Sequence, residues 1–212
     1  MNNRIEKYVW EHTSEENQVL KELDRDTHLH ILHPRMISGH IQGKLMELLV
    51  SMLRPTRILE IGTFTGYSAI CMATALPQDG LLHTIEINDE LQAIAQSYFR
   101  KAGVENKIIQ HIGDACNLIP RIDATFDLVY LDGNKREYSS YYDTVWPKLR
   151  IGGFILADNI LWYEKVIEKA DPKDAQTFEI QCFNNKVAGD KRVTQVILPL
   201  RDGLMLIRKD HD

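Results

Sequence analysis

The stretch EIGTFTGYS, residues 60–68, follows a short apolar run and contains two glycines separated by three residues. Gly62 lets the backbone turn sharply and lets a ligand come close, because glycine has no Cβ atom. The run RILEI at 57–61 predicts a strand, and residues 67–76 predict a helix. A strand, a glycine turn and a helix in this order indicate the start of a βαβ unit, whose turn lies where such sheets bind ligands.

The same alternation continues along the chain. Further strands are predicted at 82–87, 107–112, 126–131 and 153–157, and helices at 89–103 and 138–149. Strands and helices that alternate at this spacing indicate a mainly parallel sheet with helices on both faces. Two last runs, 195–200 and 204–208, flank Arg201-Asp202-Gly203 and predict an antiparallel β-hairpin. The sequence therefore predicts an open α/β sheet with ligands beyond the carboxyl ends of its strands.

The residues before this sheet are expected to be helical. Ser14 is a candidate start for a helix that runs to about Leu32 and is broken by Pro34. Residues 38–53 place apolar side chains at helical spacing, and Pro55 ends that helix. Because no repeat or Gly/Ser-rich linker interrupts the chain, we expect one domain over 1–212, with helices in 1–54 that cover the site and an α/β core in 55–212.

Composition narrows the class of protein. The 212 residues are 44% hydrophobic and 26% charged, which fits a globular domain with a sizeable core. With a net charge of −5, the protein lacks the positive electrostatic field that is typical of a dedicated nucleic-acid-binding protein. The three cysteines form no CxxC pair, which argues against a disulfide framework or a zinc knuckle. With no signal-like start and no apolar run of about 18 to 20 residues, a cytoplasmic protein without a membrane partner is expected.

Two glutamates flank the glycine turn. Glu60 stands directly before Gly62, where a carboxylate would repel a pyrophosphate but suits a ligand that carries an ammonium group. Glu86, at the end of the second strand, can accept both hydroxyls of a ribose. A nucleoside joined to an amino acid, without phosphate, describes S-adenosylmethionine. The simpler interpretation is a helix-capping glycine turn with two surface glutamates.

Oxygen-bearing side chains also end two later strands. Asp132 closes the strand at 126–131, and Asp158 and Asn159 close the strand at 153–157. Because these ends are close in the predicted sheet, three oxygen ligands from two loops can converge. Two carboxylates and an amide carbonyl suit Mg²⁺, Mn²⁺ or Ca²⁺ rather than zinc. The alternative is that each residue only forms a turn or caps a helix.

These segments, taken together, resemble the metal-dependent class I S-adenosylmethionine O-methyltransferases related to catechol and caffeoyl-CoA O-methyltransferases. The resemblance runs in order from about residue 36 to the C-terminus. It rests on Met36-Ile37-Ser38-Gly39, EIGTFTGYS, Glu86, Gly113-Asp114-Ala115, Leu131-Asp132-Gly133-Asn134-Lys135, Asp158-Asn159 and Asp202-Gly203-Leu204. It implies a Rossmann-like fold, with a mainly parallel seven-stranded sheet, a C-terminal antiparallel hairpin and extra N-terminal helices.

The resemblance implies a set of cofactor-binding residues. Those on the methionine side of S-adenosylmethionine would be Met36, Ser38, Gly62, Thr63 and Ser68. Glu86 would hold the ribose, and Asp114 and Ala115 would flank the adenine. Asp132 would border both the cofactor and the metal. Glu60 matches the family's acidic position, where it would contact the cofactor or act indirectly by fixing the turn.

The resemblance also places the metal ligands on Asp132, Asp158 and Asn159, with Mg²⁺ favoured over Mn²⁺ and Ca²⁺. Asp132 and Lys135 would form the catalytic pair, in which the Lys135 ammonium stabilises a forming phenolate or acts as a general base. Without the resemblance, Lys135 would be interpreted as a solvated loop lysine. The local sequence DGNK departs from the family's commoner DADK-like form but keeps this lysine.

The implied activity is methyl transfer to a hydroxyl of a small catechol-like or hydroxycinnamoyl acceptor, by a homodimer. A hydroxylated uridine in tRNA is a second acceptor to consider, since some bacterial relatives methylate such a base. The net charge argues mildly against it, although four basic residues could form a local patch: Arg54, Arg57, Lys148 and Arg150. The segment 160–186 is expected to shape the acceptor pocket, with Trp162 and Tyr163 stacking on a planar substrate or packing the loop on the domain.

Two other classes of function remain open from the residues. An NAD-dependent oxidoreductase explains the βαβ pattern and Glu86, but not the GxxxG spacing, Glu60 or the pair Asp158-Asn159. A binding module without activity explains the fold and gives the oxygen-rich strand ends no purpose. The histidine-rich run HLHILH at 28–33 looks metal-like, but it contains no carboxylate and precedes the sheet, so we interpret it as a partly exposed helix end.

Overall fold

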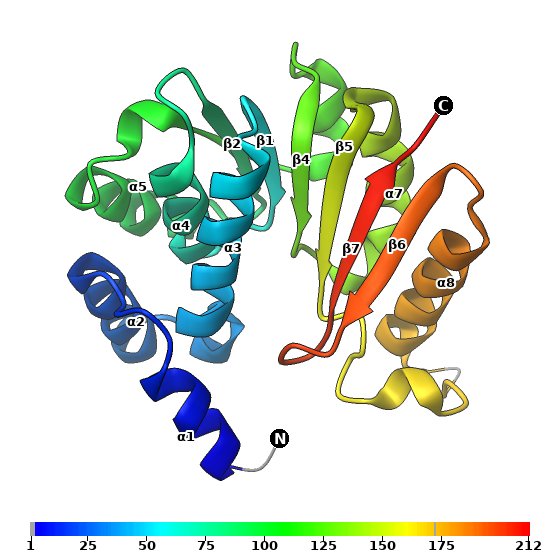
Figure 1. Ribbon diagram of the computed structural model, residues 1–212, viewed down its shortest axis with the longest axis horizontal. Helices are drawn as coiled ribbons and strands as arrows, with labels where there is room; N and C mark the ends of the chain where they lie inside the picture. Colours follow the sequence, from blue (N-terminus) through cyan, green and yellow to red (C-terminus); the bar gives the residue numbers. More distant parts are fainter. Residues whose placement is uncertain (1–2, 172) are drawn as a thin grey trace.

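The computed structural model describes residues 3–171 and 173–212, and in these residues one sheet of seven strands runs in the order β3-β2-β1-β4-β5-β7-β6 (Figure 1). The strands are β1 (Arg57–Ile61), β2 (Leu81–Glu86), β3 (Ile108–Ile112), β4 (Phe126–Leu131), β5 (Leu149–Asp158), β6 (Val193–Leu198) and β7 (Leu204–Lys209). β1 to β5 pair in parallel, and β7 pairs antiparallel with β5 and β6. The predicted parallel sheet and C-terminal hairpin are confirmed.

Helices cover both faces of the sheet. The helices are α1 (Asn3–Glu11), α2 (Gln18–His30), α3 (His40–Leu53), α4 (Tyr67–Ala75), α5 (Gln92–Lys101), α6 (Ala115–Leu118), α7 (Tyr138–Val145) and α8 (Ala175–Gly189). Side chains of α2 to α5 build one apolar cluster against the sheet, and those of α6 to α8 build a second on the other face (Figure 1). None of the helices in the described residues is long and apolar enough to cross a bilayer.

Several predicted boundaries shift. The second N-terminal helix begins after Asn17, whose side chain accepts a hydrogen bond from the Val19 amide at 2.9 Å, and not at Ser14. α1 was not predicted as a separate helix, although Ile5, Tyr8 and Val9 follow helical spacing; these side chains are exposed. α8 was not predicted either, although its buried side chains Ile180, Phe183 and Val187 follow helical spacing. The sequence interpretation expected residues 160–186 to shape the acceptor pocket and assigned no helix there.

The turn after β1 is fixed by its contact with the end of β4. Gly62 has a φ of +101°, and a Cβ atom there would overlap the carbonyl oxygen of Asp132. The Asp132 amide in turn donates to the Ile61 carbonyl at 2.9 Å. Gly62 is therefore required by the close approach of two protein segments, in addition to any ligand that the turn binds.

Replacing Gly62 with alanine should lower the free energy of unfolding by about 2 to 4 kcal/mol, because positive-φ strain adds to a backbone overlap. Urea denaturation followed by circular dichroism measures the change. Gly103→Ala is the matched control: φ is +69° there, but no atom lies within 4 Å of the added Cβ. It should cost only about 1 to 2 kcal/mol. Equal losses in the two variants would contradict the proposed role of the Asp132 contact.

Candidate active site

A buried carboxyl group, that of Glu60, supports the glycine turn through hydrogen bonds. Glu60 in β1 is fully buried, and its carboxylate accepts hydrogen bonds from the Ser68 and Thr84 hydroxyls, both at 2.5 Å. The Thr63 hydroxyl shares a further hydrogen bond of 2.5 Å with Thr84. Burial raises the pKa of Glu60 to about 8, against the lowering effect of the two hydroxyls. This enclosure supports the indirect role of Glu60, in which it fixes the turn.

Glu86 ends β2 beside this turn. One carboxylate oxygen accepts from the Phe64 amide at 2.8 Å, and the other accepts from the Asn88 amide at 3.0 Å. Each oxygen keeps a lone pair for another donor, so the carboxylate is oriented by backbone and still able to accept ribose hydroxyls. The structure thus places Glu86 next to the glycine turn, as its predicted role requires.

The other residues predicted on the cofactor side lie at the ends of short elements. Asp114 caps α6 and accepts from the Asn117 amide at 2.9 Å, and Ala115 is buried behind it. Met36 ends a short 3₁₀ turn and is 60% exposed, whereas Ser38 is buried just before α3. Asp114 thus helps to form the turn that follows β3, next to the end of β2, because the Gly113 amide donates to the Glu86 carbonyl at 2.8 Å.

The two predicted carboxylates lie at the ends of adjacent strands, β4 and β5. Tyr130, fully buried in β4, has its hydroxyl 2.9 Å from Asp158 Oδ2 and 3.5 Å from Asp132 Oδ2. Burial raises the pKa of Asp132 to about 6, with repulsion from Asp158 adding to the effect and the Lys135 ammonium opposing it. Two acidic groups that share one hydroxyl are therefore held together in a site of low polarity.

Asn159 completes this oxygen-rich group. Its backbone lies in the left-handed region at a φ of +58°, and its amide N–H donates to Asp158 Oδ1 at 2.8 Å. No hydrogen-bond partner for its side-chain amide is found in the described residues. Nor does the described part of the chain hold a group of three His, Cys, Asp or Glu side chains placed for a metal. A cation here would need the Asn159 carbonyl as its third protein ligand, and the donor set fits a hard ion.

Lys135 points into the same site. Its ammonium donates to Asp132 Oδ1 and to the Tyr138 hydroxyl, both at 2.7 Å, and the residue is only 8% exposed. The Tyr138 hydroxyl donates to the Asp158 carbonyl at 2.9 Å. The interpretation of Lys135 as a solvated loop lysine is therefore wrong. Tyr138 was missed at the sequence level, since a tyrosine at a helix start carries no signal of its own.

Two further residues around Asp158 were also missed. Gln42 of α3 donates from Nε2 to Asp158 Oδ2 at 2.6 Å and to the Tyr130 hydroxyl at 2.9 Å. Arg201, in the turn between β6 and β7, donates to Gln42 Oε1 at 3.3 Å. The one available signal was Gln42 itself, a polar residue one position from the apolar stripe of residues 38–53.

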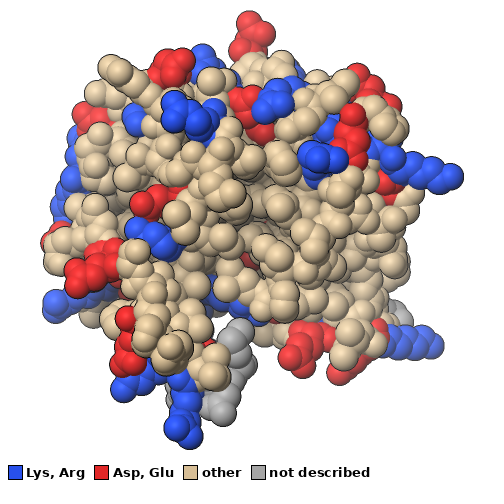
Figure 2. Space-filling model, in the orientation of Figure 1, with Lys and Arg blue, Asp and Glu red and all other residues tan. Residues whose placement is uncertain are grey.

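The basic residues that could have formed a nucleic-acid patch lie elsewhere. Arg57 begins β1, and Arg150 stands near the start of β5, so both are at the edge opposite the carboxyl ends of the strands. Arg57 donates to the Asp79 carbonyl at 3.2 Å, and Arg150 pairs with Asp127 at 2.5 Å. Figure 2 shows positive and negative side chains interspersed on the visible face. Arg57 and Arg150 thus do not lie beside the candidate site.

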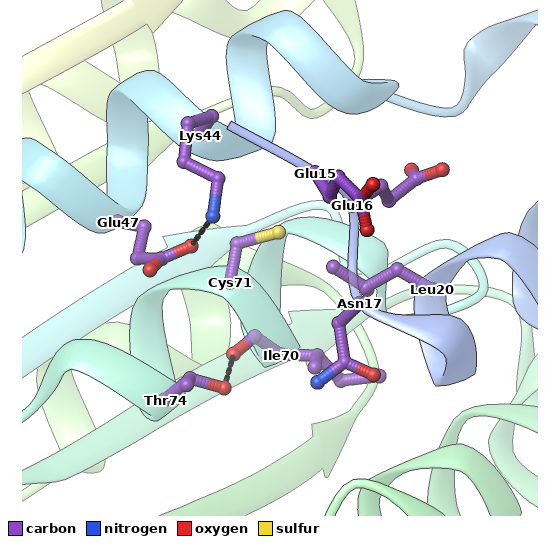
Figure 3. A pocket seen from close by; sticks show the side chains of 9 residues that line it. All are labelled: Glu15, Glu16, Asn17, Leu20, Lys44, Glu47, Ile70, Cys71 and Thr74. Carbon is purple, nitrogen blue, oxygen red and sulfur yellow. Dashed lines mark hydrogen bonds and ion pairs between the residues drawn. The ribbon is translucent and has the colours of Figure 1, made fainter. Parts of the chain in front are cut away.

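A cavity of about 290 Å³ lies apart from these residues, among the start of α2, α3 and α4 (Figure 3). It is lined by Glu15, Glu16, Asn17, Leu20, Lys44, Glu47, Ile70, Cys71 and Thr74. Its charged groups are largely paired: Glu16 accepts from the Tyr67 hydroxyl, and Lys44 binds Glu47 at 2.7 Å. Burial raises the pKa of the Cys71 thiol, so this cysteine is not a reactive thiolate. None of the predicted site residues lines this cavity.

Comparisons with known proteins point to one family. The chain matches the family described as O-methyltransferase over residues 10–210. It is 30% identical to "Probable caffeoyl-CoA O-methyltransferase 2" of Dictyostelium discoideum, over 98% of this chain and 92% of the relative. The crystal structure of the O-methyltransferase TomG from Streptomyces achromogenes, in complex with SAM, is 32% identical and has a TM-score of 0.92, covering 99% of this chain and 97% of that one. The O-methyltransferase from Bacillus cereus in complex with SAH is 25% identical with a TM-score of 0.90, covering 97% of both chains.

The buried Glu60 should make stability depend on pH. Because its pKa rises from 4.5 to about 8 on folding, the folded protein binds the proton more tightly than the unfolded chain. The associated stability is complete below about pH 4.5 and is lost as the pH rises through 8. We expect Glu60→Gln, which cannot ionise, to flatten the fall in the free energy of unfolding between pH 5 and pH 9. Urea denaturation at several pH values tests this, with the exposed Glu105→Gln as the control that should keep the wild-type slope.

Proposed function

This chain belongs to the O-methyltransferase family and is an S-adenosylmethionine-dependent O-methyltransferase of the caffeoyl-CoA type; we propose that its acceptor is a small catechol-like or hydroxycinnamoyl compound and that a divalent cation binds with it. The observation that carries the proposal is the pairing of Asp132 and Asp158 through the Tyr130 hydroxyl, with the Asn159 backbone N–H donating to Asp158. The alternatives of an NAD-dependent oxidoreductase and of a binding module are wrong, because family and relatives agree on methyl transfer.

We propose that the cofactor occupies the carboxyl ends of β1 and β2. There Glu86 would accept the ribose hydroxyls, while Asp114 and Ala115 would flank the adenine. The methionine side would face the glycine turn and the segment that precedes α3, formed by Met36, Ser38, Gly62, Thr63 and Ser68. Glu60 would support this turn from beneath, through the hydroxyls of Ser68 and Thr84.

The cation would be held by Asp132, Asp158 and Asn159, with Mg²⁺ preferred on the chemistry of the oxygen donors. When bound there, such an ion would supply Lewis-acid chemistry that favours loss of the acceptor's hydroxyl proton. The neighbouring carboxylates of Asp132 and Asp158 repel each other, and a cation between them would offset this repulsion.

Lys135 would act on the acceptor hydroxyl, either on its proton or on the negative charge that develops on its oxygen. Its ammonium lies between Asp132 and the Tyr138 hydroxyl, so it is held at the site by two hydrogen bonds of 2.7 Å. It would stabilise the forming phenolate or, once deprotonated, take the hydroxyl proton. The acceptor oxygen then attacks the methyl carbon, the carbon–sulfur bond breaks, and S-adenosylhomocysteine leaves.

We also propose that the protein is a homodimer. In α1, the side chains of Tyr8 and Trp10 are 59% and 57% exposed. Exposed aromatic side chains on one helix are typical of a surface that packs against another protein, here a second copy of this chain. Light scattering at micromolar concentration should give twice the chain mass of 24.5 kDa. A monomer mass across that range would disprove this proposal.

Loss of the Glu86 carboxylate should weaken cofactor binding. Glu86→Ala removes a charged acceptor, which should raise the dissociation constant for S-adenosylhomocysteine by about 10- to 150-fold. Isothermal titration calorimetry measures this, and circular dichroism checks that the variant is folded. Glu90→Ala, an exposed glutamate four residues away, should bind like wild type. Unchanged affinity in a folded Glu86→Ala protein would contradict the assignment.

Metal removal provides the sharpest test of the proposed function. EDTA should abolish methyl transfer to catechol or hydroxycinnamoyl acceptors, and Mg²⁺ or Mn²⁺ should restore it. Asp158→Ala should lose activity by several orders of magnitude, because one carboxylate ligand is gone, while S-adenosylhomocysteine affinity changes far less. Asp143→Ala, on the exposed face of α7, is the control that should keep full activity. Full turnover in thoroughly chelated wild-type enzyme would exclude the metal-dependent mechanism.

A further inference from the structure

The turn between β6 and β7, at the end of the C-terminal hairpin in Figure 1, contacts both the loop after β5 and the segment before α3. On the acceptor side, Asp202 Oδ1 accepts from the Tyr163 amide at 2.5 Å, and the Gly203 carbonyl accepts from the Ile160 amide at 3.2 Å. On the cofactor side, both terminal nitrogens of the Arg201 guanidinium donate to the Ile37 carbonyl at 3.2 Å. One turn therefore holds both the loop after β5 and the segment before α3.

Arg201 also reaches the candidate metal ligand through Gln42. Its guanidinium donates to Gln42 Oε1 at 3.3 Å, and Gln42 Nε2 donates to Asp158 Oδ2 at 2.6 Å. Gln42 is fully buried. A continuous path of hydrogen bonds thus runs from the Ile37 carbonyl through Arg201 and Gln42 to Asp158; we call it the Arg201–Gln42 path.

The direction of the Gln42 amide depends on Arg201. An amide can present either its oxygen or its NH₂ group to a neighbour, and the two ends differ only in hydrogen bonding. A guanidinium can only donate, so it selects the oxygen. The NH₂ group is then left to face the Asp158 carboxylate, where a flipped amide would place oxygen against oxygen. Arg201 and the Asp158 carboxylate thus favour the same direction of the Gln42 amide, and Gln42 is one of three groups that donate to Asp158, beside the Tyr130 hydroxyl and the Asn159 backbone N–H.

The two ends of this path belong to different halves of the reaction. Ile37 stands between Met36 and Ser38, which we assign to the cofactor, and Asp158 is assigned to the cation and acceptor. We propose that Arg201 and Gln42 are positioning residues that couple cofactor binding to the geometry of Asp158. This proposal rests on the proposed function, because it takes both assignments from it.

A double-mutant cycle on cofactor affinity tests the coupling without any metal. The variants are Gln42→Leu, Arg201→Met and their combination, each titrated with S-adenosylhomocysteine by calorimetry. We expect Arg201→Met to weaken binding by about 10-fold and Gln42→Leu by about 3- to 10-fold, since the latter releases Arg201. The combined variant should have the same S-adenosylhomocysteine affinity as the single variant that binds more weakly. Arg201→Lys should recover part of the loss.

The matched control is Arg208→Met, which removes an arginine of the same hairpin that pairs with Asp210. It should change affinity by less than about 2-fold, since surface pairs contribute little. Independent, multiplicative effects of Gln42→Leu and Arg201→Met would overturn the coupling. So would an unchanged affinity in Gln42→Leu.

Mn²⁺ binding, followed by electron paramagnetic resonance, separates this proposal from the proposed function. Wild type should bind Mn²⁺, and Asp158→Ala should not. Equal Mn²⁺ affinities of the two proteins would contradict the metal site, and the coupling would then be decided by the double-mutant cycle on S-adenosylhomocysteine affinity. If wild type binds, Arg201→Met and Gln42→Leu should each weaken Mn²⁺ binding by about 10-fold or more, as supporting residues of metal ligands do. Wild-type Mn²⁺ affinity in both variants would overturn the coupling while sustaining the metal site.

Discussion

The close approach of the Gly62 turn to the backbone of Asp132 is the constraint on which the rest of the site depends. It brings the cofactor-side turn of β1 against the end of β4, whose neighbour β5 carries Asp158. No residue with a side chain satisfies both the φ of +101° and the overlap with the Asp132 carbonyl. The glycine turn after β1 can therefore lie directly against the end of β4, since no Cβ atom separates the two backbones.

The site gathers buried acidic groups, which is costly without positive charge nearby. Glu60, Glu86, Asp132 and Asp158 are buried or nearly so, and burial raises the pKa of Glu60 and Asp132. Lys135 offsets part of this cost beside Asp132. The negative charge at the ends of β4 and β5 is what would favour the cation proposed there.

The fold was largely predictable because its signals are local. Apolar runs, glycines and the final Arg201-Asp202-Gly203 turn indicated the strands and the hairpin without knowledge of their partners. α1 and α8 were not predicted as helices although both carry apolar side chains at helical spacing; those of α1 are exposed, and those of α8 are buried. Arg57 and Arg150 lie near the starts of β1 and β5, at the edge of the sheet opposite the candidate site, and both contact Asp127.

The sequence by itself determined the order of strands and helices and the placement of Glu86, Asp132, Asp158 and Asn159 at strand ends, since these follow from periodicity within a few residues. Only the tertiary structure decided what holds those groups. Gln42 reaches Tyr130 across 88 residues of sequence, Asp158 across 116 and Arg201 across 159. Hydrogen bonds of this range depend on which strands are neighbours and on how α3 packs against the sheet, and local periodicity carries no information about either.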